Sequence, residues 1–294
     1  MENYDILMVG HFAKDELIVD GKGKVSSGGG VYYGSMALRQ IGLKVAVATR
    51  LKREDFPRLE ELKSAGIQVF ATPSEQTSGI ANYYQSSNME RRICKLIGFA
   101  GTMKLEEIPD FPVKTIMVCG IIAGEVDLPT LKILARRAPL ALDVQGFVRV
   151  PEGDDLVFKP WPEMVEGLRH VTYLKVDRAE AEHLTGETDL FTAARKLASY
   201  GPEEIVLTQT SGPTVYAGGE FFQAPFTSRS LAGRTGRGDT CFSSYIGRRL
   251  SAGPKEAALW SAAVTSLKQE KPGPWRGPVA EAEALMRQFE LAGD

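Results

Sequence analysis

Short apolar runs rich in Val, Ile and Leu alternate along this chain with longer segments of helical periodicity. The runs are residues 6–9, 45–48, 115–119, 140–144, 171–176 and 204–208. This alternation predicts a mainly parallel sheet covered by helices on both faces, because parallel strands need long crossover connections and are buried on both sides. We therefore expect an α/β fold, a doubly wound sheet flanked by helices, with residues 1–294 forming one domain.

Two segments interrupt the alternation. Residues 16–25 predict a hairpin around Gly-Lys-Gly, and residues 78–97 alternate like two strands joined by a polar turn near Ser86-Ser87-Asn88. Neither has the length or the helices of a βαβ unit. We expect a small β-sheet lid, formed by about residues 15–27 and 78–98, that stands off the main domain.

The last third of the chain predicts helices. They cover residues 240–250, 254–269 and 279–291. Pro254 begins the second of them, at a position where proline is favoured.

The composition favours small-molecule partners. The 35 basic and 37 acidic residues nearly balance, and no segment gathers Lys and Arg densely enough to predict a nucleic-acid partner. The three cysteines are widely separated, which excludes a disulfide framework and favours the reducing cytoplasm. The acidic start is not a signal peptide, and no apolar run reaches the roughly 20 residues that span a membrane. We expect a soluble cytoplasmic protein with no membrane partner.

Residues 235–239, Thr-Gly-Arg-Gly-Asp, directly precede the first of these expected helices. Gly236 and Gly238 let the backbone approach an anion closely, and a helix start offers N–H groups and a positive dipole end. Asp239 adds a carboxylate that can accept the proton of an attacking hydroxyl. The segment therefore suits phosphoryl transfer to a hydroxyl; the structural alternative is a glycine-rich turn in which Asp239 caps the helix.

The chain resembles the ribokinase-like, PfkB-type carbohydrate kinases over nearly its whole length. Residues 235–239 match the family's Thr-Gly-Ala-Gly-Asp loop, with Arg237 in place of Ala. Residues 28–42 match its N-terminal signature, a Gly-Gly pair followed by a small-residue helix. The resemblance implies an ATP-dependent kinase of a small sugar or polyol. Asp239 would be its catalytic base, and the backbone of Gly236, Arg237 and Gly238 its anion hole.

The resemblance also implies an acceptor site. Asp15 keeps the family's spacing from Gly10, and a carboxylate anchors a polyol well because both its oxygens accept hydrogen bonds. Tyr33 replaces the Asn of many members, which predicts a narrower or more apolar pocket. Residues 143–149 and 266–272 look most like the myo-inositol kinase branch. The expected acceptor-binding residues are Asp15, Gly28, Gly29, Tyr33, Gln145 and Arg149.

For the donor, the resemblance implies ATP with Mg²⁺. Asp177 and Glu180 match the family's Asn-x-x-Glu motif with Asp in place of Asn, and Glu180 would hold hydrated Mg²⁺ through water. The alternative is a charged helix N-terminus. Asp177, Thr208, Thr210 and Gly212 are expected to bind the nucleotide, and residues 262–268 to lie along the adenine.

Other functions remain open. The same fold would also serve a nucleoside kinase or a non-catalytic relative that senses a sugar or nucleotide, although the intact Asp239 disfavours a sensor. A dinucleotide-dependent oxidoreductase is disfavoured because the glycines at 28–34 follow a polar segment and no acidic residue ends the next strand at Thr49-Arg50. The resemblance allows a monovalent cation, and it allows a monomer or a homodimer paired through the lid, since bare strand edges invite pairing.

Overall fold

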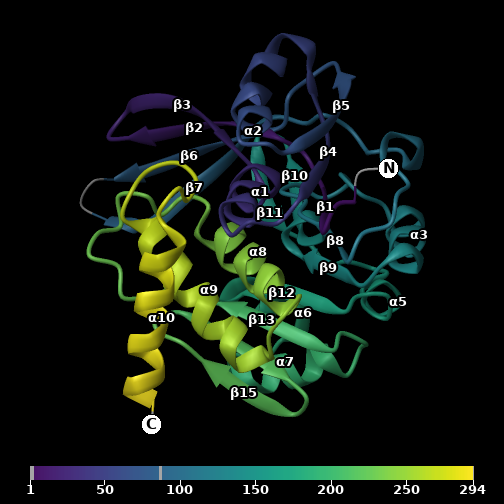
Figure 1. Cartoon of the computed structure of the whole chain (residues 1–294). Coiled ribbons are helices and arrows are strands. Elements are labelled where there is room, and N and C mark those ends of the chain that lie inside the picture. The colour runs from purple at the N-terminus through teal and green to yellow at the C-terminus, as the bar shows by residue number, and fades with distance from the viewer. Residues whose placement is uncertain (1–2, 86–87, 294) are drawn as a thin grey trace.

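A nine-stranded sheet runs through the centre of the molecule, in the order β15-β14-β13-β12-β9-β8-β1-β4-β5 (Figure 1). The computed structural model describes residues 3–85 and 88–293. The strands are β1 (Ile6–Val9), β4 (Val45–Lys52), β5 (Gln68–Ser74), β8 (Thr115–Val118), β9 (Leu140–Asp143), β12 (Tyr173–Asp177), β13 (Glu204–Thr208), β14 (Pro213–Ala217) and β15 (Glu220–Gln223).

Within this sheet, the neighbouring strands β13, β12, β9, β8, β1, β4 and β5 are all parallel. Strands β14 and β15 add an antiparallel edge beside β13. This confirms the predicted doubly wound α/β fold. The β14–β15 hairpin was not predicted, although Val215 and Gly218-Gly219 carry its signal, alternation followed by a glycine turn.

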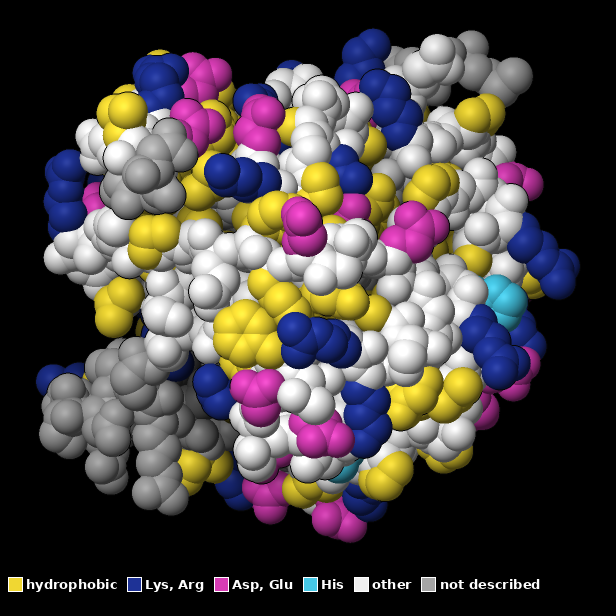
Figure 2. All heavy atoms as spheres, turned by 90° about the horizontal axis from the view of Figure 1, so that it is seen from below, with side chains coloured by type: hydrophobic (Ala, Val, Ile, Leu, Met, Phe, Trp, Pro, Cys, Tyr) yellow, Lys and Arg dark blue, Asp and Glu magenta, His cyan; other side chains and the backbone are white. Residues whose placement is uncertain are grey.

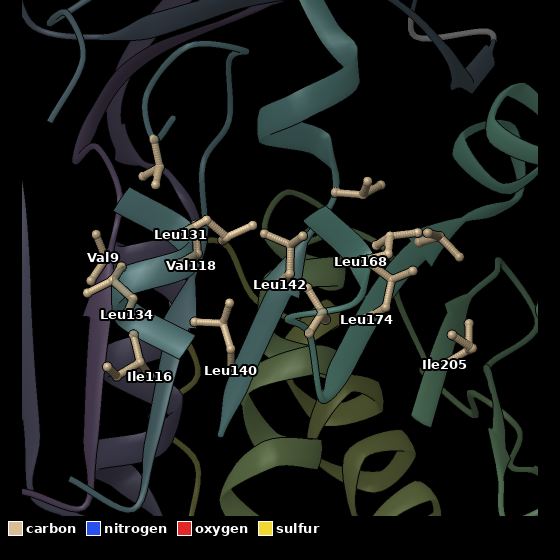
Figure 3. Packing of buried hydrophobic residues seen from close by; sticks show 14 of the residues in the cluster. Val9, Ile116, Val118, Leu131, Leu134, Leu140, Leu142, Leu168, Leu174 and Ile205 are labelled. Atoms are coloured by element: carbon tan, nitrogen blue, oxygen red, sulfur yellow. The ribbon is translucent and has the colours of Figure 1, made fainter. Parts of the chain in front are cut away.

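Helices cover both faces of this sheet, because alternate residues of each strand supply two separate apolar layers. One layer joins the strands to α3 (Leu128–Arg137), α5 (Met164–Leu168), α6 (Arg178–Thr185) and α7 (Leu190–Ala198). Figure 3 shows Leu142 and Leu174 from two neighbouring strands in this layer, with Leu131 and Leu168 from the helices.

The opposite layer joins the strands to four other helices: α1 (Gly30–Gln40), α2 (Glu60–Ser64), α8 (Arg237–Arg249) and α9 (Pro254–Gln269). The C-terminal α10 (Val279–Gly293) packs against α9 (Figure 1). The short elements are η1 (Arg53–Leu59), η2 (Leu105–Glu107) and α4 (Gln145–Val148).

A second, six-stranded sheet has the order β10-β11-β7-β6-β2-β3. Its strands are β2 (Ala13–Val19), β3 (Lys22–Gly28), β6 (Gly79–Gln85), β7 (Asn88–Gly98), β10 (Arg149–Glu152) and β11 (Asp155–Phe158). It contains both expected hairpins and, in addition, β10 and β11, which were not predicted. The turn expected near residues 86–88 lies partly outside the described residues. In Figure 1, β2, β3, β6 and β7 project to one side of the main sheet.

Helix α8 begins earlier than residue 240, where we expected it. Gly236 adopts a left-handed conformation, φ 81°, and is the N-cap residue, so that Arg237, Gly238 and Asp239 form the first turn. A left-handed cap favours glycine, which has no Cβ to clash. Asp239 is therefore inside the helix and does not cap it.

The surface carries both signs of charge. Figure 2 shows Lys and Arg side chains interspersed with Asp and Glu over the face that it presents. Across the residues that the structure describes, no helix has the length and apolar character needed to cross a membrane.

Candidate functional site

A cavity of about 290 Å³ lies where the carboxyl ends of the central strands meet the smaller sheet and the start of α8. Open α/β sheets commonly bind their ligands at this edge, because the loops that follow the strands converge there. The cavity is lined by Asp15, Gly29, Tyr33, Ile80, Asn82, Ile121, Gln145, Arg149, Lys175, Asp177, Thr208, Arg234, Thr235, Gly236, Arg237, Gly238 and Asp239.

Most of the residues expected from the sequence therefore lie together. Those that do not line this cavity are Gly28, Glu180, Thr210 and Gly212. The lining residues that sequence reasoning missed are Ile80, Asn82, Ile121, Lys175 and Arg234.

The start of α8 forms one end of the cavity. A Cβ at Gly236 would lie 2.3 Å from Cγ of Tyr33, so this position needs glycine for space as well as for its positive φ. The first N–H groups of a helix have no partner within it and can donate to an anion. The N–H of Arg237 instead donates to the carbonyl oxygen of Arg234, at 3.1 Å. In this structure that group is used by the turn, which leaves the N–H groups of Gly236 and Gly238 as the candidate donors.

The glycines at the start of α1 bring that helix close to Asp239. A Cβ at Gly30 would lie 2.7 Å from Cβ of Cys119 and 3.4 Å from Oδ1 of Asp239. Gly29, the residue before the helix, has φ 89°. The glycine signature thus lets α1 approach both the end of β8 and the carboxylate of Asp239.

The smaller sheet positions Asp15 at the other end of the cavity. Oδ1 of Asp15 accepts the N–H of Ile80, at 2.9 Å, which ties β2 to β6. A Cβ at Gly28 would lie 2.0 Å from Oδ2 of Asp15, so Gly28 makes room for this carboxylate rather than lining the cavity. Asn82 is buried on β6 beside it, and its Oδ1 accepts the thiol of Cys94 at 3.4 Å.

A buried lysine lies beneath residues 233–238, which we call the anion loop. Nζ of Lys175 is 3.1 Å from Oδ1 of Asp143 and 3.5 Å from Oε2 of Glu180, and the three side chains are 5%, 7% and 0% exposed. A Cβ at Gly238 would lie 3.8 Å from this Nζ. The available signal for Lys175 was an ionisable residue inside an otherwise apolar strand.

The three buried charges set one another's protonation. Burial raises the pKa of Glu180 to about 7 and raises the pKa of Asp143, although Lys175 opposes both shifts. Burial acts to lower the pKa of Lys175, but attraction to Asp143 and Glu180 outweighs it and raises that pKa. One ammonium group thus faces two buried carboxyl groups and can neutralise only one of them when both are ionised.

Asp177 and Glu180 form a capping box at the start of α6. Oδ1 of Asp177 accepts the N–H of Glu180 at 2.8 Å, and Oε2 of Glu180 accepts the N–H of Asp177 at 2.7 Å. The expected helix-terminus alternative is therefore realised. Of the pair only Asp177 lines the cavity, and Glu180 is fully buried behind it.

A hydrated magnesium ion fits this wall of the cavity. In the described part of the chain, no three His, Cys, Asp or Glu residues are grouped to hold a metal. Mg²⁺ does not require such a group, because it keeps most of its waters and binds through substrate phosphates and one or two carboxylates. Asp177 is the carboxylate available beside the anion loop, and a role for Glu180 through water stays a prediction.

Residues 210–212 and 262–266, which were expected to contact the nucleotide, lie outside the cavity. A Cβ at Gly212 would lie 1.9 Å from the carbonyl oxygen of Ala224, and the N–H of Phe226 donates to Ser211 at 2.8 Å, so residues 210–212 pack against residues 224–226. Residues 262–266 of α9 are 0% exposed. These segments offer no surface to the cavity in this conformation.

Positive charge gathers near the anion loop. Lys175, Arg149, Arg234 and Arg237 line the cavity together with the carboxylates of Asp15, Asp177 and Asp239. Fixed cations beside helix N–H groups suit a compact polyanion, and a carboxylate at each end suits an acceptor with hydroxyl groups.

Comparisons with known proteins identify related kinases. Residues 6–276 match the model of the pfkB family of carbohydrate kinases. The chain is 35% identical to a pyrophosphate-dependent kinase in the ribokinase family, solved with a pyrophosphate analogue and myo-inositol, with a TM-score of 0.88 over 95% of this chain and 99% of that one.

Two further solved structures are similar. One is a pyrophosphate-dependent myo-inositol-1 kinase that was converted into a myo-inositol-3 kinase by replacing an asparagine and a serine with leucine. It is 34% identical to this chain, with a TM-score of 0.87 over 96% of this chain and 99% of that one. The other is Arabidopsis thaliana ribokinase complexed with ribose and ATP, with 17% identity and a TM-score of 0.77 over 97% of this chain and 99% of that one, which shows the shared fold. Among curated protein sequences, no match was found.

We predict that Lys175→Met lowers the free energy of unfolding by about 3 kcal/mol or more at neutral pH, because it leaves two buried carboxylates without a counter-charge. Without Lys175, the folded-state pKa values of Asp143 and Glu180 rise further above their unfolded values. Stability is then retained at low pH and lost as pH rises through those values, so the deficit should be larger at about pH 8 than at about pH 5.

Urea unfolding of both proteins at the two pH values measures this difference. Lys63→Met is the matched control, because Lys63 is exposed and pairs with Glu60 at the surface. A deficit that is equal at both pH values would contradict the assignment of the three groups as one charge cluster.

Proposed function

Since this chain belongs to the pfkB family of carbohydrate kinases, which makes it a phosphotransferase acting on a sugar or polyol, we propose that it phosphorylates an inositol-like polyol with pyrophosphate as donor. The observation that carries the proposal is a single cavity that contains both ends of such a reaction. Asp15 and the start of α8 with Asp239 both line it.

The acceptor end supports a compact, hydroxyl-rich molecule. Asp15, Asn82, Gln145 and Arg149 line it with acceptors and donors, and Tyr33 and Ile121 add apolar surface. A cyclic polyol has hydroxyl groups around its rim and carbon–hydrogen faces, so it would match this mixture. The relatives with bound or named myo-inositol favour the same class.

The donor end supports pyrophosphate over the ATP that the sequence predicted. Pyrophosphate needs cations and N–H donors but no apolar slot for a base. Arg234 and Arg237 provide charge beside the loop, while residues 262–266 are buried and residues 210–212 do not line the cavity. Two pyrophosphate-dependent relatives, which are 35% and 36% identical to this chain, also favour pyrophosphate as the donor.

The proposed reaction moves one phosphoryl group. The acceptor oxygen attacks one phosphorus of pyrophosphate, a new O–P bond forms, and the bridging O–P bond breaks so that its electron pair leaves with inorganic phosphate. Asp239 accepts the hydroxyl proton, which leaves late in a loose transition state, so an ordinary aspartate suffices as base. The loop N–H groups stabilise the charge on the transferred group, and bound Mg²⁺ would neutralise the oxygens of the donor.

The smaller sheet would act as the lid. It contributes Asp15, Ile80, Asn82 and Arg149 to the cavity wall, so its closure over the acceptor would complete the site and exclude water. Water would otherwise compete with the acceptor and hydrolyse the donor.

We predict that Mg²⁺-pyrophosphate supports phosphorylation of myo-inositol with kcat/KM at least about 100-fold above that with Mg²⁺-ATP. The reason is that residues 262–266, which were expected to lie along the adenine, are buried. Phosphate release and ³¹P NMR of the product measure both reactions, with hexoses, pentoses and nucleosides as comparison acceptors. A clear preference for ATP would overturn the donor assignment, and turnover of nucleosides alone would overturn the acceptor class.

We predict that Asp239→Asn lowers kcat by about 10³-fold, because the hydroxyl proton loses its acceptor, while pyrophosphate affinity is retained or increased as a negative charge is removed. Stopped assays and calorimetric titration with pyrophosphate measure the two effects. Asp110→Asn, at an exposed carboxylate remote from the cavity, is the matched control. Turnover at the wild-type rate would exclude Asp239 as the base.

A further inference from the structure

Lys268 is a buried cation beside the anion loop. It lies in the last turn of α9 and is 2% exposed. Its Nζ donates hydrogen bonds to the carbonyl oxygens of Gly233 and Thr235. These carbonyls belong to the segment that leads directly into Gly236.

A lysine in the last turn of a helix ordinarily interacts favourably with the helix's own C-terminal carbonyls. Lys268 differs, because its two carbonyl partners belong to another segment, and the side chain is buried to reach them. Burial is costly for an ammonium group and lowers the pKa of Lys268 to about 8, although attraction to Asp239 opposes the shift. A cost of this kind calls for a role beyond helix capping.

The loop is held between Lys268 and Tyr33. The ring of Tyr33 packs against Gly236, and Nζ of Lys268 lies 5.0 Å from the centre of that ring. The N–H of Gly233 donates to the carbonyl oxygen of Gln269 at 2.7 Å. A Cβ at Gly233 would lie 1.8 Å from the carbonyl oxygen of Lys271, so the loop lies directly on the end of α9.

Peptide geometry turns this contact into a constraint on the site. The carbonyl of Thr235 and the N–H of Gly236 belong to one planar trans peptide unit and point in opposite directions. When Lys268 holds the carbonyl toward α9, the N–H of Gly236 must point away from α9. Thr235 and Gly236 both line the cavity, so that side is where a donor phosphate would bind.

We propose that Lys268 is a positioning residue for phosphoryl transfer: it fixes the Thr235–Gly236 peptide unit so that the Gly236 N–H is aimed at the donor. The inference rests on the proposed function, in that the donor binds at this loop. It predicts that loss of the ammonium group impairs donor binding and turnover, while acceptor binding at Asp15 is spared.

The first test compares Lys268→Met with Lys255→Met, which removes an exposed lysine from the first turn of the same helix. We expect kcat with Mg²⁺-pyrophosphate to fall by about 100-fold in Lys268→Met, with the KM for myo-inositol within about threefold of wild type. Lys255→Met should match wild type. A folded Lys268→Met protein with kcat within about twofold of wild type would overturn the inference.

The second test is chemical rescue of Lys268→Ala by ammonium or methylammonium chloride. A small ammonium ion can occupy the space left by the side chain and donate to the same two carbonyls. We expect at least about tenfold recovery of kcat/KM for pyrophosphate, and none with tetramethylammonium at equal ionic strength, because that ion has no N–H donor. A folded Lys268→Ala protein that neither ammonium nor methylammonium rescues would show that the side chain is needed only for packing, which would overturn the inference.

A third measurement uses the wild-type protein and so does not depend on whether a variant folds. The charged or titratable groups that face Lys268 are Asp239 of α8 and Tyr33 of α1. Because the pKa of Lys268 is lowered, its charge is present below about pH 8 and lost above it, so kcat/KM for pyrophosphate should fall as pH rises through about 8. Lys268→Arg should keep its charge and move this fall to higher pH. A wild-type profile that is flat to about pH 10 would overturn the inference.

The outcomes separate the two proposals. If the wild type turns over with ATP alone, the donor assignment fails, but the same Lys268 comparisons are made with ATP. If the wild type is active and Lys268→Met equals it, the inference on Lys268 fails and the proposed function stands.

Discussion

The site depends on the backbone conformation at Gly236, which starts α8 at the edge of the sheet. With φ 81° and no Cβ, this residue lets the chain turn against the ring of Tyr33 and present the first turn of α8 to the cavity. Asp239 then lies one turn into the helix, where the N–H groups and the carboxylate share one small volume. Any side chain at Gly236 would displace either the helix start or Tyr33.

The rest of the fold brings matching groups to that point. Gly30 lets α1 approach Asp239, while β2 and β6 together place Asp15 across the cavity. Beneath the loop, Lys175 balances Asp143 and Glu180, and on its other side Lys268 holds two of its carbonyls. The anion loop thus has a buried cation beside it from each of two separate elements, β12 and α9.

The sequence was sufficient for several parts that have a local signal. The apolar runs predicted the central strands, and the helix over residues 254–269 was predicted with its observed bounds. The glycine signature predicted a helix after Gly28-Gly29, and α1 is found at Gly30–Gln40. The β10–β11 hairpin was missed although Gly153-Asp154 is a local turn signal. Lys175, Asn82 and Lys268 were missed because they acquire their roles from neighbours farther away in the sequence. Residues 262–266 are buried, which affects the choice between ATP and pyrophosphate as donor. Their burial could not be predicted because it depends on how the segment before Gly236 packs on α9.

The most direct test of the account is a structure of the protein with methylenediphosphonate, Mg²⁺ and myo-inositol. The account predicts that both ligands share the one cavity, with an acceptor hydroxyl within hydrogen-bond reach of the Asp239 carboxylate and one phosphonate group at the N–H groups that begin α8. A phosphonate bound away from this helix start, or an acceptor whose hydroxyls all lie beyond reach of Asp239, would contradict it.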